Sequence, residues 1–140
     1  DELSSTVTAN AVNKQTGALD PVQRITMLPE DFDGTSSAAD IHISPDGKFL
    51  YASNRGHDSL AIYRIDQSTG RLELVGHEPT RGGHPRNFAI DKFGEFVFVA
   101  NRDNDNVVLF ERDAETGLLT YTGVEATVPR AVCVTQYLIY

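Results

Sequence analysis

Short apolar runs separated by turn-forming residues are the main pattern of this chain. Between residues 40 and 76 the predicted strands are Asp40–Ser44, Phe49–Ser53, Leu60–Ile65 and Leu72–Gly76. The two middle strands are almost wholly apolar instead of alternating, so both of their faces should be buried. A sheet stacked between two similar sheets meets this requirement.

The same unit occurs twice along the chain. Residues 40–76 match residues 87–123 without gaps at an offset of 47, and 11 of the 37 aligned positions are identical. Gly, Asn and Asp recur at the turns with apolar residues between them, as in a duplicated structural unit. A four-stranded unit of this length is typical of a β-propeller blade, and no segment has the 3.6-residue period of a long helix. The sequence therefore predicts an all-β fold.

We interpret residues 1–140 as a partial β-propeller domain, with two complete four-stranded blades and partial blades at both ends. The predicted parts are strands c and d of one blade at 6–28, full blades at 39–77 and 86–124, and strand a of the next blade at 130–135. The last part is expected because Pro129–Val134 mirrors Pro85–Ile90. Since a propeller closes with about four to eight blades, the remaining blades are expected from another chain or from further copies. The chain does not begin with methionine, which suggests that it starts inside a longer chain, although removal of a leader would leave the same sequence start.

Composition limits the possible partners and the compartment. The formal net charge of −8 argues against a general electrostatic grip on nucleic acid or on an anionic membrane. No apolar run approaches the roughly 20 residues that a membrane helix needs. The single cysteine, Cys133, cannot form an internal disulfide framework, which favours a cytoplasmic location.

Propeller topology points to one end of the central channel as the functional site. The b–c and d–a connections meet at this end, which we call the mouth, and a local basic cluster there would suit an anionic ligand. The residues expected at the mouth are His42, Arg55 and Arg86, together with Asp40, His57, His84, Asn87 and Arg102. In contrast, the pairs Asn54/Asn101 and Asp58/Asp105 recur in both units, so we expect them to cap loops.

Several motifs resemble one enzyme family. They are the string Asp-Ile-His-Ile-Ser-Pro-Asp-Gly at 40–47, Ser-Asn-Arg at 53–55 and His-Pro-Arg-Asn-Phe at 84–88. From about Thr6 to Thr135 the chain resembles the C-terminal part of the 6-phosphogluconolactonase family of seven-bladed β-propeller lactonases. The resemblance implies a cytoplasmic carboxylic ester hydrolase of carbohydrate metabolism. Such an enzyme converts 6-phosphogluconolactone to 6-phosphogluconate in the pentose phosphate pathway, without a metal or other cofactor.

Lactone hydrolysis requires a base for water, a donor for the oxyanion and a clamp for the phosphate. We expect His42 to be the base, because an unperturbed imidazole titrates near neutral pH. We expect Arg55 and Arg86 to be the oxyanion donor or the phosphate clamp, because a guanidinium offers charged, bidentate hydrogen bonds. The sequence has no Gly-x-Ser-x-Gly motif for a nucleophilic serine.

Two other functions remain open at the level of sequence. The chain could be part of a non-catalytic β-propeller that serves as a binding or scaffold module, since one architecture hosts many functions. A muconate-type lactonizing enzyme is a related alternative, because the lactonase family also resembles fungal carboxy-muconate cyclases. No metal site is expected, because the four histidines do not have metal-ligand spacing.

Overall fold

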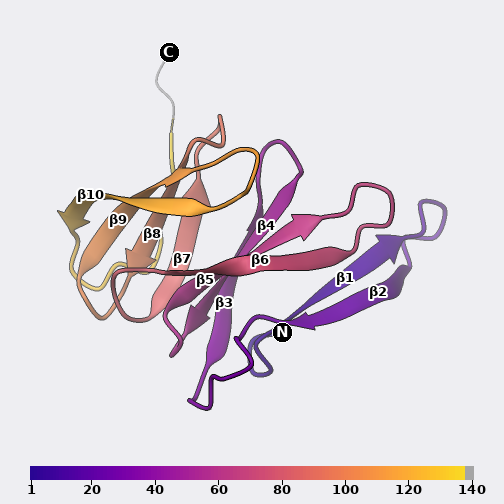
Figure 1. Ribbon diagram of the computed structural model, residues 1–140, viewed down its shortest axis with the longest axis horizontal. Helices are drawn as coiled ribbons and strands as arrows, with labels where there is room; N and C mark the ends of the chain where they lie inside the picture. Colours follow the sequence, from indigo (N-terminus) through magenta and orange to yellow (C-terminus); the bar gives the residue numbers. More distant parts are fainter. Residues whose placement is uncertain (138–140) are drawn as a thin grey trace.

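The computed structural model describes residues 1–137, which form ten strands and no helix (Figure 1). The strands are β1 (Thr6–Val12), β2 (Leu19–Thr26), β3 (Ser37–Ile43), β4 (Phe49–Arg55), β5 (Ser59–Ile65), β6 (Leu72–Pro79), β7 (Pro85–Ile90), β8 (Phe96–Asn101), β9 (Asn106–Arg112) and β10 (Leu119–Thr127). All pairings are antiparallel. A hairpin, β1–β2, accompanies two four-stranded sheets, β3-β4-β5-β6 and β7-β8-β9-β10, in which spatial order follows chain order. The predicted all-β, propeller-like fold is confirmed.

The first full sheet begins earlier than the sequence indicated. β3 starts at Ser37 instead of Asp40, because Ser37 and Ala38 pair with Arg55 and Asn54 beyond a register shift in the ladder. This extension brings the start of β3 beside the end of β4, where Arg55 lies.

The strands β4 and β5 are the most enclosed, as their apolar sequences predicted. Residues Phe49–Asn54 of β4 and Ser59–Tyr63 of β5 are all buried. Alternate side chains pack on one side against the hairpin, through Val7 and Met27, and on the other side against the second sheet. Each fully buried large apolar side chain is worth about 1.5–3 kcal/mol, so these two strands anchor the fold.

The connections that precede β1, β5 and β9 share one backbone conformation and one backbone hydrogen bond. Ser5, Asp58 and Asp105 adopt positive φ angles of 46°, 51° and 53°. Their carbonyl oxygens accept hydrogen bonds from the backbone N–H groups of Met27, Thr80 and Val128, at 2.9, 3.0 and 2.7 Å. Each of these residues therefore bonds its b–c connection to the segment that follows strand d of the same blade.

The repeated asparagines add a side-chain hydrogen bond to two of these connections. Asn54 Nδ2 donates to the carbonyl oxygen of Met27 at 2.9 Å, and Asn101 Nδ2 donates to that of Thr80 at 2.7 Å. Both asparagines are fully buried, where a lost amide hydrogen bond would leave an unsatisfied polar group. Their expected structural role agrees with these contacts.

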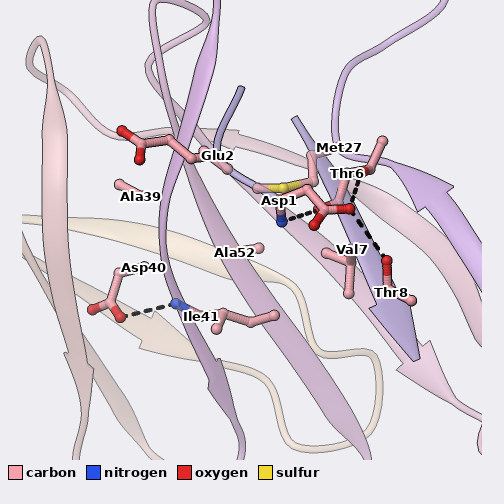
Figure 2. A pocket seen from close by; sticks show the side chains of 11 residues that line it. Asp1, Glu2, Thr6, Val7, Thr8, Met27, Ala39, Asp40, Ile41 and Ala52 are labelled. Atoms are coloured by element: carbon pink, nitrogen blue, oxygen red, sulfur yellow. Dashed lines mark hydrogen bonds between the residues drawn. The ribbon is translucent and has the colours of Figure 1, made fainter. Parts of the chain in front are cut away.

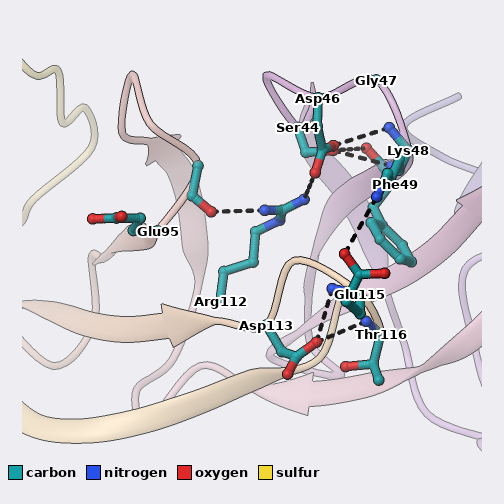
Figure 3. Close-up of polar contacts among 12 residues, drawn as sticks. Ser44, Asp46, Gly47, Lys48, Phe49, Glu95, Arg112, Asp113, Glu115 and Thr116 are labelled. Carbon is teal, nitrogen blue, oxygen red and sulfur yellow. Dashed lines mark hydrogen bonds and ion pairs between the residues drawn. The ribbon is translucent and has the colours of Figure 1, made fainter.

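A buried arginine joins the two full sheets at the end opposite the mouth (Figure 3). The side chain of Arg112 is 1% exposed and forms an ion pair with Asp46, on the β3–β4 turn. Its other guanidinium nitrogens donate to Tyr51 Oη at 3.1 Å and to the carbonyl oxygen of Gly94 at 2.7 Å. Tyr51 Oη in turn donates to the carbonyl oxygen of Gly117 at 2.7 Å. This network ties turns of both sheets together.

Acid is expected to weaken the network through Asp46. Burial alone would raise the pKa of Asp46, but hydrogen bonds from Ser44, the Lys48 N–H and Arg112 lower it from 3.8 to about 2. Because the folded pKa lies below the unfolded value, the carboxylate stabilises the fold above pH 4, and this contribution disappears as the pH falls towards 2. Denaturation midpoints of the complete protein measured between pH 5 and 2 should show this loss. The Asp46→Asn variant should have a flatter profile, and equal profiles would contradict the expectation.

The strand expected at Ala131–Thr135 does not form. Residues 131–137 have no ladder with any other described segment, and a strand requires a hydrogen-bonded neighbour. The segment does run beside β7, since Val134 N donates to Asn87 Oδ1 at 2.6 Å. One blade earlier, Phe88 N donates in the same way to Asp40 Oδ2 at 3.2 Å.

These contacts also correct the register assumed for Pro129–Val134. The N–H of Arg130 donates to Asp105 Oδ1, and the N–H of His84 donates to Asp58 Oδ1. Both Arg130 and His84 have positive φ angles, of 50° and 59°. Arg130 therefore takes the place of His84, and its likeness to Arg86 is limited to the Pro-Arg dipeptide.

The second sheet has an apolar outer face. Phe98, Val107, Leu109 and Val124 are exposed or half-buried and line a cavity of about 150 Å³. Tyr51, Leu60 and Ile62, the counterparts of Phe98, Val107 and Leu109 in the first sheet, pack against the second sheet, so this surface has the composition of a contact between blades. Among the described residues there is no helix of the length and apolar character needed to cross a membrane.

Candidate active site

A polar cavity lies where the ends of β3, β4 and β7 approach each other. It has a volume of about 170 Å³ and is lined by Glu2, Ala38, Ala39, Arg55 and Arg86. Ala38 and Ala39 belong to the start of β3, Arg55 ends β4, and Arg86 is the second residue of β7. This is the mouth as defined from topology, and it contains two of the three residues expected to be catalytic.

Arg55 lines this cavity and is held there by two partners. Its side chain is 13% exposed and pairs with Glu2. Arg55 Nη2 also donates to the carbonyl oxygen of Ala38 at 2.6 Å. The backbone of Glu2 is tied to the same residue, since the Ala38 N–H donates to the Glu2 carbonyl oxygen at 2.8 Å. Glu2, Ala38 and Arg55 therefore form one rigid unit.

Glu2 presents an ionised carboxylate at this position. Its side chain is 62% exposed. The hydrogen bond from Arg55, and then the positive charges of Arg55 and Arg86, hold the pKa of Glu2 below its usual value. In Figure 2, which shows the adjoining cavity between β1 and β3, the Glu2 carboxylate extends to the side where Ala39 lies, away from Asp1. The carboxylate is thus accessible and negatively charged at neutral pH.

His84 and Arg102 stand beside the cavity. Arg102 Nε donates to Asp103 Oδ1 at 2.7 Å, and His84 Nδ1 lies 3.9 Å from Asp103 Oδ2. Burial lowers the pKa of the His84 imidazole, and the positive charges of Arg102, Arg55 and Arg86 lower it further, against the opposing effect of Asp103. The structure therefore brings Arg55, Arg86, Arg102 and a neutral His84 into one positively charged neighbourhood.

His42 lies in a different cavity, contrary to the expected convergence with Arg55 and Arg86. This cavity, of about 320 Å³, is lined by His42, Ile43, Pro45, Ala89, Ile90, Lys92, Thr135 and Gln136, and shares no residue with the mouth cavity. The reason is depth along the strand. His42 is four residues beyond Ala38 on β3, a rise of roughly 13 Å at about 3.3 Å per residue.

Asp40 and Asn87, expected to contact substrate, instead join the inner strands of the two sheets. Asp40 Oδ2 accepts hydrogen bonds from Asn87 Nδ2 at 2.6 Å and from the Phe88 N–H at 3.2 Å. The same oxygen lies 3.0 Å from His42 Nε2, and the His42 ring packs edge-on against Phe88 at 4.7 Å. These contacts keep β3 and β7 in register.

His57 belongs to the b–c connection between β4 and β5 but does not line the mouth cavity. Its Nδ1 is 2.6 Å from Ser59 Oγ. Its ring packs edge-on against Phe32 and His77, with centroids 4.9 and 5.5 Å away. Burial, followed by the neighbouring His77, lowers the pKa of His57. Because the ring is enclosed by these neighbours, it is not placed to contact a ligand in the mouth cavity.

The sequence analysis missed Glu2, although the repeat contained a signal for it. The strands β1 and β5 begin 53 residues apart, at Thr6 and Ser59. Extending this offset upstream aligns Asp1-Glu2 with Asn54-Arg55. Glu2, Arg55 and Arg102 are therefore equivalent positions in three successive b–c connections, with an acidic residue in the first.

Within residues 1–137, no three His, Cys, Asp or Glu side chains are grouped so that they could hold a metal ion.

Comparison with known proteins identifies the family. The family described as "Lactonase, 7-bladed beta-propeller" matches residues 1–136. The chain belongs to this family. A 6-phosphogluconolactonase from Formosa agariphila is 71% identical over 56 residues, which cover 39% of this chain and 16% of that protein. The Bacillus subtilis 6-phosphogluconolactonase is 41% identical over 90 residues, or 64% of this chain and 26% of that protein.

Solved structures agree with this assignment. The periplasmic gluconolactonase PpgL of Pseudomonas aeruginosa superimposes with a TM-score of 0.87 at 34% identity, covering 93% of this chain and 36% of that one. The match to the Bacillus subtilis relative spans about a quarter of its length. In this seven-bladed lactonase family, the chain thus accounts for two full blades and part of another.

Proposed function

We propose that the complete protein containing this chain is a lactonase that hydrolyses 6-phosphogluconolactone to 6-phosphogluconate. The observation that carries the proposal is the Glu2–Arg55 pair, which shares the mouth cavity with Arg86. The names of the relatives, 6-phosphogluconolactonase and gluconolactonase, support a lactone ester as substrate. The proposal includes a role in the pentose phosphate pathway.

The proposed mechanism assigns the base to Glu2 in place of His42. The Glu2 carboxylate accepts a proton from water as the water oxygen attacks the lactone carbonyl carbon. The Arg55 guanidinium donates hydrogen bonds to the oxyanion of the tetrahedral intermediate. Collapse of the intermediate breaks the bond between the carbonyl carbon and the ring oxygen. The ring oxygen takes up the proton, so that a hydroxy acid is released.

The same pair explains how a weak base is sufficient. The hydrogen bond from Arg55 lowers the pKa of Glu2, so that the carboxylate is ionised and able to accept a proton, although it is a weaker base than an unpaired glutamate. A cyclic ester is already reactive, so catalysis here depends mainly on positioning and on oxyanion stabilisation. The rigid attachment of both residues to Ala38 supplies that positioning.

The complete protein provides the test. Turnover of 6-phosphogluconolactone should be measured in a coupled assay for 6-phosphogluconate, with the rate of spontaneous ring opening subtracted. We expect a kcat within the usual enzyme range of about 1–10³ s⁻¹. A rate equal to spontaneous opening would contradict the proposal and would favour a non-catalytic binding module.

Location and assembly are also part of this proposal. The single cysteine supports a cytoplasmic protein. The apolar outer face of the second sheet, with Phe98, Leu109 and Val124, supports coverage by a further blade. We propose that this blade comes from the remainder of the complete protein or from another copy.

A further inference from the structure

The three arginines near the mouth differ in what they already bind. Arg55 is engaged by Glu2 and by the carbonyl oxygen of Ala38. Arg102 is engaged by Asp103. Arg86 is exposed, and its guanidinium has no hydrogen bond or ion pair with any of residues 1–137. Of the three, Arg86 is therefore the one ready to bind an anion without first breaking an ion pair.

The backbone that carries Arg86 is well fixed. The preceding residue, Pro85, is buried and pairs with Asn101. The following residue, Asn87, is bound to Asp40 at 2.6 Å, and the Phe88 N–H is bound to the same carboxylate. A binding group on a rigid strand keeps its position relative to the reacting groups better than one on a loop.

The position of Arg86 relative to Glu2 and Arg55 separates two tasks. All three residues line one cavity of about 170 Å³. Glu2 and Arg55 are bound to each other, whereas Arg86 contributes to the local positive charge sensed by Glu2 and by His84. Because Glu2 offsets the charge of Arg55 and Asp103 offsets that of Arg102, the excess positive charge at this place is that of Arg86, and it favours an anionic group there.

We propose that Arg86 binds the phosphate of a phosphorylated lactone and thereby sets the preference for sugar-phosphate lactones over unphosphorylated ones. A guanidinium binds phosphate through two parallel, charge-assisted hydrogen bonds, which suits this ligand class. The inference rests on the proposed lactonase function, in which Glu2 and Arg55 act on the ester at the other end of the substrate. The two lactones in the names of the relatives, 6-phosphogluconolactone and gluconolactone, differ by this phosphate.

The test compares two substrates in the complete protein. Values of kcat/KM for 6-phosphogluconolactone and for gluconolactone are measured in the native protein and in the Arg86→Gln variant. We expect the ratio of the two values to fall at least tenfold in Arg86→Gln, through a higher KM for the phosphorylated lactone. Arg86→Lys keeps the charge but loses the bidentate geometry. Its ratio of kcat/KM values should lie between that of the native protein and that of Arg86→Gln.

Inorganic phosphate provides a second readout that does not depend on turnover. Its dissociation constant, measured by calorimetry, should rise at least tenfold in Arg86→Gln. The matched control is Lys14→Gln, which removes the same charge from the exposed β1–β2 turn and should leave both readouts unchanged.

The possible failures are distinguishable. An equal loss of kcat/KM for both lactones, or no change in the ratio, would overturn the role of Arg86 in phosphate recognition. Absence of turnover of either lactone by the native protein would instead overturn the proposed function. In that case, unchanged phosphate affinity in Arg86→Gln would also refute the anion site, and weakened affinity would support it.

Discussion

Replacing Glu2 by glutamine is expected to lower the kcat of the complete protein on 6-phosphogluconolactone by about 100-fold or more, as for the loss of a general base. Glutamine preserves size and can still contact Arg55, but it cannot accept the proton of the attacking water. Because the residue is exposed and lies in an irregular segment, folding should be unaffected. Steady-state kinetics at neutral pH provide the measurement.

Glu73→Gln is the matched control for this experiment. Glu73 is exposed on β6, outside the residues that line the mouth cavity, so the same chemical change there should leave kcat within about twofold. A Glu2→Gln variant with native kcat would show that Glu2 only positions Arg55. The base would then have to be sought elsewhere in the complete protein.

The second large effect concerns stability. Arg112→Ala is expected to destabilise the complete protein by about 3 kcal/mol, because it removes several hydrogen bonds from a buried charged group, each worth about 1.5–3 kcal/mol before the structure relaxes. The substitution would leave the Asp46 carboxylate, Tyr51 Oη and the Gly94 carbonyl oxygen without their partner. The measurement is the shift of the denaturant midpoint.

Arg112→Met and Arg71→Ala serve as comparisons. Methionine fills most of the space of the arginine stem, so the loss should be smaller than with alanine, because packing is retained. Arg71 is exposed, and surface substitutions usually change stability by less than about 0.5 kcal/mol. If Arg112→Ala behaved like Arg71→Ala, the network would not hold the two sheets together.

Two residues expected at the mouth, His42 and Asp40, lie or act elsewhere in the structure. His42 was expected at the mouth because it is polar, unmatched in the repeat and on an inner strand. Those features place it on the channel side of β3 but give no depth along the strand, and the structure places it in a separate cavity with Lys92. Asp40 was expected to contact substrate, yet its carboxylate is used by Asn87 and Phe88.

Glu2 and Arg112 were missed for different reasons. Glu2 precedes the first recognised strand, and it becomes visible only when the blade offset is carried upstream of β1. Arg112 has Ile65 as its counterpart in the first repeat, so the repeat marks it as a variable position. Only the approach of the β3–β4 turn to the end of β9 shows that it is buried beside Asp46.

Periodicity and spacing along the chain were enough to establish the blades, the propeller class and the turns that punctuate them. These features depend on local backbone preferences and on which strands must be buried, and the order of residue types along the chain determines both. The functional groupings came only from the folded arrangement. Which arginine is already paired, which histidine lies apart from the mouth cavity and which carboxylate lines it depend on contacts between residues far apart in the chain, and the order of residue types does not record such contacts.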